Sequence, residues 1–237
     1  MIGSLYKIFF FQPLANILAF LINALPLHDL GFAIIILTIF VKLILLPFAH
    51  HSTVTQRKMR EIEPKIAELK EKLKNNKEEQ AKQTIALYRA HGISPFSSFL
   101  ALFFQLPVLI ALFLLLKGGP VFDAGVLYSF VQLPIEVNTN FLGVIELLKP
   151  SYIIAVLAGI SQFFQIYLSM PKLKSNNSKH SFSEEFQKGL AVQMKYIMPV
   201  VIVFIAAKFS SGVALYWTIS NVFAIVHEVI VARKVNK

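Results

Sequence analysis

The sequence has no cysteine and few charged residues. With no cysteine among its 237 residues, the chain can form no disulfide, no thiolate metal site and no cysteine nucleophile. Charged residues make up only 15% of it and hydrophobic residues 56%, whereas soluble domains average roughly 25% and 45–50%. A soluble fold of this length lacks an interior large enough to bury that much apolar surface. The composition therefore excludes an ordinary soluble enzyme, a disordered chain and a coiled-coil rod, and it indicates a membrane protein.

The sequence motifs of soluble catalysis are absent as well. The chain contains no phosphate-binding glycine loop, no H-E-x-x-H and no nucleophile elbow. His50 and His51 are neighbours, so on a helix their rings point about 100° apart, which is not the spacing of metal ligands. We expect a protein that is not an enzyme and that uses neither a metal nor a cofactor.

Five apolar segments predict five transmembrane helices, because a span needs about 20 mostly apolar residues. The predicted spans are 30–48, 96–116, 151–170, 195–208 and 212–232. The last two are separated by a short turn and are expected to form a helical hairpin. The predicted fold class is an all-α membrane protein.

The N-terminal segment 1–29 admits three interpretations. Its stretch 2–25 is apolar enough for a sixth span or for a cleaved signal peptide. However, Gln12, Asn16 and Asn23 are four and seven residues apart, which places them on one helical face. A polar stripe on an apolar helix favours an amphipathic helix that lies in the membrane interface. We predict such an interfacial helix, on the extracytoplasmic side.

The distribution of basic residues predicts the orientation of the chain. There are 23 Lys and Arg against 13 Asp and Glu, a formal net charge of +10. Segments 49–97, 171–194 and 233–237 hold 17 of the 23, and five spans place all three segments on one side. By the positive-inside rule that side is the cytoplasm, so 117–150 is an extracytoplasmic loop and the short tail is cytoplasmic. Topology explains the net charge, and we expect no specific nucleic-acid partner.

Segment 49–95 predicts an antiparallel helical hairpin in the cytoplasm. An apolar stripe with the 3–4 spacing of a coiled-coil seam precedes Asn75 and Asn76, and a second stripe follows them. The first stripe is Met59, Ile62, Ile66, Leu69 and Leu73, and the second is Ala81, Ile85 and Tyr88. Pro64 is expected to kink the first helix. The hairpin is either a spacer with solvated faces or a docking arm, since it is far longer than a connection requires.

Lys42 is the most informative residue, because it lies inside a predicted span. A lysine at mid-span costs roughly 2.5–3.5 kcal/mol, so it should face a wet cavity or a partner, for which His227 and Glu228 are candidates. Alternatively, its amine snorkels to the lipid headgroups. Other polar residues of the predicted spans could line a recess together with Lys42, or could simply bond neighbouring helices. These residues are Thr38, Gln105, Gln162, Gln165, Trp217, Ser220 and Asn221.

Five stretches of the sequence together carry a family resemblance. They are 31–47 around Lys42, 56–64 and 87–95 in the predicted hairpin, Gln105-Leu-Pro107, and 211–221, which reads Ser-Gly-Val-Ala-Leu-Tyr-Trp-Thr-Ile-Ser-Asn. The first stretch resembles the first core span of the YidC/Oxa1/Alb3 membrane protein insertases, and the next two resemble the cytoplasmic loop of that family. The last two stretches resemble its second span and its last span. The resemblance covers nearly the whole chain.

The resemblance implies an insertase that receives hydrophobic segments of nascent proteins and releases them sideways into lipid. In the family, a positive residue of the first core span lies in a hydrophilic groove open to cytoplasm and bilayer. Lys42 holds that position, where the family usually has arginine. Gln105 matches the groove glutamine, and Thr38 and Trp217 match positions implicated in substrate contact. The remaining groove candidates are Gln162, Gln165, Ser220 and Asn221.

The resemblance also implies partners and a location. Besides nascent membrane proteins and the lipid bilayer, we expect the ribosome as a partner, with the Sec translocon and the signal-recognition receptor as further candidates. The residues expected to contact the ribosome or a targeting factor are Arg57, Lys58, Arg60, Arg233 and Lys234. The expected location is the bacterial cytoplasmic (inner) membrane. A second hypothesis is a small ion-coupled transporter with Lys42 as a proton-sensitive site, although the sequence shows no inverted repeat.

Overall fold

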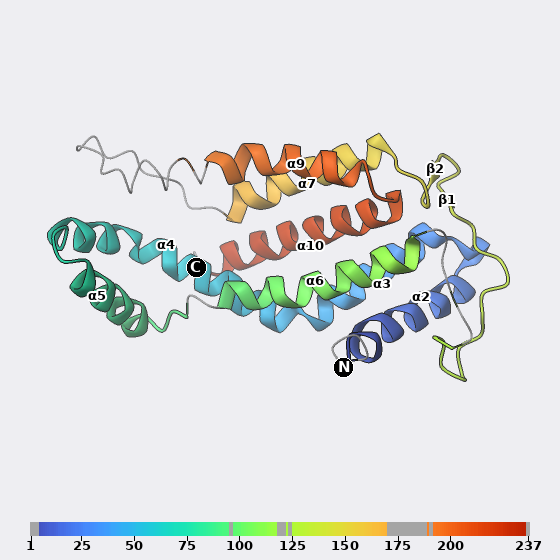
Figure 1. Ribbon diagram of the computed structural model, residues 1–237, viewed down its shortest axis with the longest axis horizontal. Helices are drawn as coiled ribbons and strands as arrows, with labels where there is room; N and C mark the ends of the chain where they lie inside the picture. Colours follow the sequence, from blue (N-terminus) through green and yellow to red (C-terminus); the bar gives the residue numbers. More distant parts are fainter. Residues whose placement is uncertain are drawn as a thin grey trace.

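The computed structural model describes residues 5–94, 97–117, 122, 125–169, 189 and 192–235. Figure 1 shows these residues as a set of helices along one long axis, with α4 and α5 projecting at one end and a loop with two short strands at the other. The helices are η1 (Lys7–Phe11), α2 (Gln12–Ala24), η2 (Pro26–His28), α3 (Leu30–Ile44), α4 (Leu46–Lys72), α5 (Lys77–Ala90), α6 (Ser97–Leu116), α7 (Tyr152–Ser169), η3 (Gln193–Ile197), α9 (Met198–Ala206) and α10 (Ser211–Val235). The strands are β1 (Asn140–Phe141) and β2 (Ile145–Glu146), which pair antiparallel.

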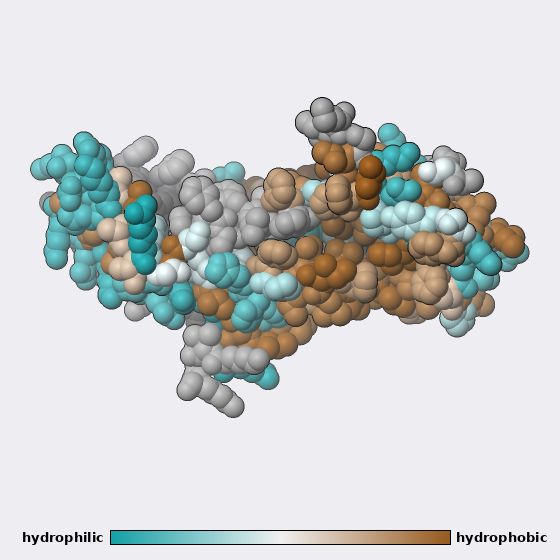
Figure 2. Space-filling model, turned by 90° about the horizontal axis from the view of Figure 1, so that it is seen from below, coloured by the Kyte–Doolittle hydropathy of each residue, from teal (hydrophilic) through white to brown (hydrophobic). Residues whose placement is uncertain are grey.

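The structure confirms an all-α membrane protein at the level of its apolar helices. Within the described residues, the segments Lys7–Ala24, Tyr152–Ser169 and Ser211–Arg233 are long and apolar enough to cross a membrane, and α3 with α4 makes a fourth if the bent pair is counted as one span. Shorter apolar helices cover Gln105–Leu116 and Gln193–Ala206. Hydrophobic residues cover the helical body, and hydrophilic residues cover the end formed by α4 and α5 (Figure 2). The predicted number of five spans stays a prediction.

The bundle core lies where α10 packs against α3 and α7, while α9 packs on the far side of α7. Fully buried side chains from several helices meet there, among them Ile34, Leu37, Leu112 and Tyr216. Gly159 of α7 allows a close approach of α9, because a Cβ at that position would lie 2.2 Å from Val203 Cγ2. Small residues are the usual way to bring two membrane helices together.

The predicted span 30–48 consists of two helix segments with a bend between them. α3 ends at Ile44, and α4 begins at Leu46 with an axis turned by 64°. Pro47 lies in the first turn of α4. Proline has no amide hydrogen to donate to the carbonyl four residues earlier, and its ring clashes with that carbonyl. The regular hydrogen bonding of α3 therefore cannot continue through Pro47. The polar hairpin therefore joins the bundle through this bend, which we call the elbow (residues 43–47).

Helices α4 and α5 fold back on each other around a small apolar cluster (Figure 1). Ile62, Ile66 and Ile93 are buried there, with Met59, Leu87 and Tyr88 packed against them. The predicted second stripe is wrong at Ala81 and Ile85, which are both exposed, Ile85 by 51%, because Leu87 takes the inward position. Helix α4 continues through Pro64 as a single helix. Asn76 accepts a hydrogen bond from the amide of Glu79 and so caps α5.

The polar stripe of α2 bonds the loop that follows α6. Asn16 is buried; its Nδ2 donates to the Val126 carbonyl at 3.1 Å, and its Oδ1 accepts from the Tyr128 amide at 2.6 Å. Asn23 Nδ2 donates to the Gln132 carbonyl at 2.8 Å. The side-chain amides of Asn16 and Asn23 therefore form hydrogen bonds with backbone groups of the loop and not with water at the membrane interface. The predicted interfacial position of this helix stays a prediction, and the stripe no longer supports it.

Candidate functional site

Lys42 directs its ammonium group between three helices. Its Nζ donates to Gln105 Oε1 on α6 at 2.8 Å, and Gln105 Nε2 donates to the Tyr216 hydroxyl on α10 at 2.5 Å. Lys42 is half-buried and Tyr216 is fully buried. Within the described part of the chain, no carboxylate lies within ion-pair distance of this ammonium. A neutral amide therefore holds the cation in place and leaves its charge uncompensated.

A second polar network joins α7 to α10 one residue further along α10. Gln162 Oε1 accepts from Trp217 Nε1 at 2.9 Å and from Asn221 Nδ2 at 3.3 Å, and Asn221 also donates to Ser161 Oγ at 3.1 Å. Gln162 Nε2 donates to Gln165 Oε1 at 3.1 Å, which extends the network along α7. Hydrogen bonds of this kind satisfy polar groups where no water is available.

The two networks contain most of the residues predicted for the site. Lys42 and Gln105 belong to the first, while Gln162, Gln165, Trp217 and Asn221 belong to the second. Tyr216 and Trp217 are adjacent on α10 and so point about 100° apart, which places the first network toward α3 and α6 and the second toward α7. We call the two networks together the polar seam.

Two residues predicted for the site, Thr38 and Ser220, form none of the hydrogen bonds of these networks. One residue that does form such a bond, Tyr216, was not predicted. Thr38 has no exposed surface, and its hydroxyl donates to the Ile34 carbonyl of its own helix at 2.6 Å. Ser220 is buried on α10 one turn after Tyr216 and on the same helical face, beside the first network. Tyr216 was not predicted, although a tyrosine in an apolar span signals a hydroxyl that needs a partner.

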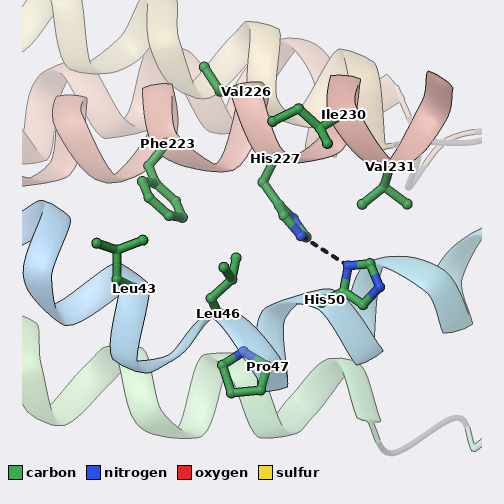
Figure 3. A pocket seen from close by; sticks show the side chains of 9 residues that line it. All are labelled: Leu43, Leu46, Pro47, His50, Phe223, Val226, His227, Ile230 and Val231. Carbon is green, nitrogen blue, oxygen red and sulfur yellow. Dashed lines mark hydrogen bonds between the residues drawn. The ribbon is translucent and has the colours of Figure 1, made fainter. Parts of the chain in front are cut away.

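A separate cavity lies between the elbow and α10 (Figure 3). It measures about 620 Å³, and its lining residues are Leu43, Leu46, Pro47, His50, Phe223, Val226, His227, Ile230 and Val231. His50 Nδ1 and His227 Nε2 are 3.3 Å apart and share a hydrogen bond. Two histidines alone fall short of the three or four ligands of a zinc site. The cavity is apolar over most of its wall and is distinct from the polar seam.

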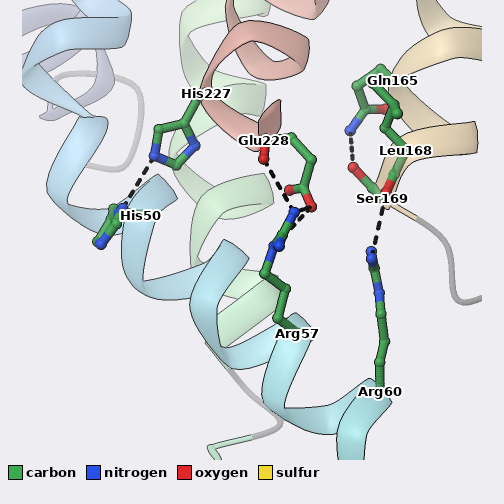
Figure 4. Close-up of polar contacts among 8 residues, drawn as sticks. All are labelled: His50, Arg57, Arg60, Gln165, Leu168, Ser169, His227 and Glu228. Carbon is green, nitrogen blue, oxygen red and sulfur yellow. Dashed lines mark hydrogen bonds and ion pairs between the residues drawn. The ribbon is translucent and has the colours of Figure 1, made fainter. Parts of the chain in front are cut away.

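The candidate ionic partners of Lys42 are engaged elsewhere. Glu228 binds Arg57, whose Nη2 lies 2.8 Å from Oε1 and also donates to the Glu228 carbonyl at 3.1 Å (Figure 4). His227 bonds His50. Neither of these candidates therefore pairs with Lys42. Both residues are far enough along α10 to face α4 rather than α3.

Two of the five predicted docking cations bind within the chain. Arg57 pairs with Glu228, and Arg60 Nη1 donates to the Leu168 carbonyl at the end of α7 at 3.4 Å. Burial lowers the pKa of the Arg60 guanidinium, and the Glu228 carboxylate opposes that shift. Lys58 and Arg233 are exposed, whereas the side chain of Lys234 lies outside the described residues. Arg57 and Arg60 thus fasten the base of the hairpin to the bundle.

Comparison with known proteins identifies the relatives of this chain. The family model described as "60Kd inner membrane protein" matches residues 7–237. A protein named "Membrane protein insertase YidC" from Fusobacterium nucleatum subsp. nucleatum is 28% identical over 229 residues, covering 95% of this chain and 98% of the relative. "Membrane protein insertase YidC 1" from Streptococcus agalactiae is 31% identical over 208 residues, covering 84% of this chain and 66% of the relative.

A longer relative matches in the same way. "Membrane protein insertase YidC" from Wolinella succinogenes is 28% identical over 225 residues, which is 95% of this chain but only 37% of the relative. The similarity thus extends over nearly all of this chain, whatever the length of the relative. Together with the family match and the motifs around Lys42 and Gln105, these relatives show that the chain belongs to the 60Kd inner membrane protein family, the YidC/Oxa1 family.

Proposed function

We propose that this chain is a membrane protein insertase, which accepts hydrophobic segments of nascent proteins at the polar seam and releases them sideways into lipid. The observation that carries the proposal is the Lys42–Gln105–Tyr216 chain of hydrogen bonds inside a largely apolar bundle. Proteins named as insertases over most of this chain's length support it.

The charge of Lys42 gives the seam its selectivity. Because Gln105 is neutral, the ammonium remains free to attract the acidic flank of an entering segment. The seam amides can exchange their bonds with one another for bonds to polar groups of the substrate, which lowers the cost of carrying those groups across. The apolar part of the segment then partitions into lipid, and the hydrophobic effect supplies the driving force.

The proposed topology has five spans, with the α4–α5 hairpin and the tail in the cytoplasm and the 117–150 loop outside. It rests on the clustering of 17 of the 23 basic residues in three segments on one side. The hairpin is the surface proposed to meet the ribosome, through exposed cations such as Lys58, because Arg57 and Arg60 are bound within the chain.

Insertion by purified protein in liposomes tests the proposal. The substrates are a single-span protein with an acidic translocated tail and the same protein with a neutral amide tail. We expect Lys42→Ala to reduce insertion of the acidic substrate about tenfold or more, and the neutral one much less, because only the acidic tail uses the charge. Lys42→Arg keeps the charge and should retain activity.

Lys149→Ala is the matched control, because it removes an exposed lysine outside the seam. Equal insertion of both substrates by the parent and Lys42→Ala would refute the role of the charge. Failure of the parent to insert either substrate would refute the proposed function itself.

A further inference from the structure

The cavity beside the elbow has the size and lining of a ligand site. Its volume of about 620 Å³ falls within the roughly 300–1,000 Å³ typical of small-molecule pockets. Seven of its nine lining residues are hydrophobic, and the two others are His50 and His227. A water molecule needs two to four polar partners, and most of this wall offers none. The lining therefore fits an apolar chain.

The cavity opens outward onto the hydrophobic surface of the molecule. Leu43, Val226 and Ile230 line it and are 53%, 52% and 49% exposed. Neighbouring side chains on the same helices, including Ile44 and Val222, are exposed and apolar too. In a membrane, the medium outside such a surface is lipid hydrocarbon, so the chain that can enter from the side is an acyl chain.

One end of the cavity is polar, and an exposed arginine follows its lining residues on α10. Figure 3 shows Leu43 and Phe223 at one end and the hydrogen-bonded His50 with Val231 at the other. On α10, the spacing of Val226, Ile230 and Arg233 is four and three residues, so the exposed guanidinium continues the stripe that borders the opening. His50 is exposed, and its Nε2 is not the atom that bonds His227. A phosphate at this end would meet Arg233 and an imidazole.

We propose that this cavity binds one anionic phospholipid of the leaflet on the hairpin side. An acyl chain lies between the elbow and α10 and reaches toward Leu43 and Phe223, while the phosphate is held by Arg233 and His50. Charge complementarity selects an anionic headgroup over a zwitterionic one. The site is separate from the polar seam, so this proposal does not depend on the proposed insertase function.

Native mass spectrometry of the purified full chain in detergent measures the retained lipid. The probes are phosphatidylglycerol and phosphatidylcholine with identical acyl chains, each offered alone, and glycerol phosphate as the headgroup without chains. We expect the parent to retain one phosphatidylglycerol in preference to phosphatidylcholine. Arg233→Gln should reduce this preference about fivefold, as expected for one basic residue near an anionic lipid surface. Arg89→Gln, an exposed arginine on the hairpin, should leave it unchanged.

Cavity-filling variants test the acyl chain. Val226→Trp and Ile230→Trp each occupy the cavity and should abolish retention of both lipids, while Ile160→Trp on the exposed face of α7 should not. Two filling variants are used so that misfolding of one, seen as a lowered thermal midpoint, does not decide the result. Undiminished retention by a folded filling variant would overturn the proposal, as would an unchanged preference in Arg233→Gln. Displacement of the lipid by glycerol phosphate would also overturn it, since the headgroup alone would then be the ligand.

Discussion

The ion pair between Arg57 and Glu228 is expected to be a main fastening between the hairpin and the bundle. The guanidinium contacts Glu228 Oε1 through Nε at 3.2 Å and through Nη2 at 2.8 Å. The two side chains are only 17% and 8% exposed, so water screens them little. We therefore predict that single replacements, Arg57→Met or Glu228→Leu, destabilise the protein strongly.

The magnitude follows from the charge that each replacement leaves behind. Removing one partner of a buried pair costs about 3–5 kcal/mol, and we expect the lower end because both side chains retain some exposure. A loss of about 3 kcal/mol lowers the unfolding midpoint of a chain of this size by about 6–12 °C. The double variant Arg57→Met with Glu228→Leu removes both members of the pair and fills the same space, so its stability should return toward that of the parent, short of the attraction that Glu228 exerts on Arg60.

Equilibrium unfolding in detergent micelles, together with the thermal midpoint, measures these differences as a double-mutant cycle. Lys82→Met is the control, because Lys82 pairs with Glu78 at the surface with side chains 67% and 80% exposed, and such pairs contribute about 0.3–0.5 kcal/mol. Additive losses in the double variant, amounting to the sum of the two single variants, would refute the idea that the pair acts as a unit.

Three further predictions concern packing and loop attachment. Asn16→Leu removes two hydrogen bonds to the 126–128 loop, one buried and one part-buried, and should destabilise by about 2–3 kcal/mol, with faster proteolysis of that loop. Gly159→Leu places atoms where Val203 packs, and we expect a loss of about 1–3 kcal/mol in thermal unfolding. In the hairpin, Ile66→Ala should cost about 2–4 kcal/mol and Ile85→Ala less than about 1, as measured by hydrogen exchange of α4, because Ile66 is buried and Ile85 is exposed. Equal effects at the two isoleucines would contradict this assignment of the hairpin interface.

Local sequence patterns predicted where the helices lie, but not which face of each helix is buried. The 3–4 spacing in segment 49–95 indicates two helices, and α4 and α5 are present. The same pattern placed Ile85 inward, whereas Leu87 and Ile93 complete the cluster. A stripe of three residues on a short helix fixes its rotation poorly, because small changes in the crossing of two helices exchange neighbouring positions.

The amide stripe of α2 shows the same limit for polar residues. Gln12, Asn16 and Asn23 suggested a wet helical face, but Asn16 is buried against loop residues more than 100 positions away. From the sequence, an amide that faces water and one that satisfies a distant carbonyl are indistinguishable. Only the packed loop provides the partner.

The sequence by itself determined the membrane character, the positions of the apolar helices, the family motifs and the presence of a cation inside an apolar helix. These depend on composition, hydrophobic length and local order, which any stretch of chain carries on its own. The tertiary structure decided which polar groups meet: Lys42 with Gln105 across 63 residues, and Arg57 with Glu228 across 171. Such pairings depend on the rotation and crossing of whole helices, and these are set by the packing of all their side chains together.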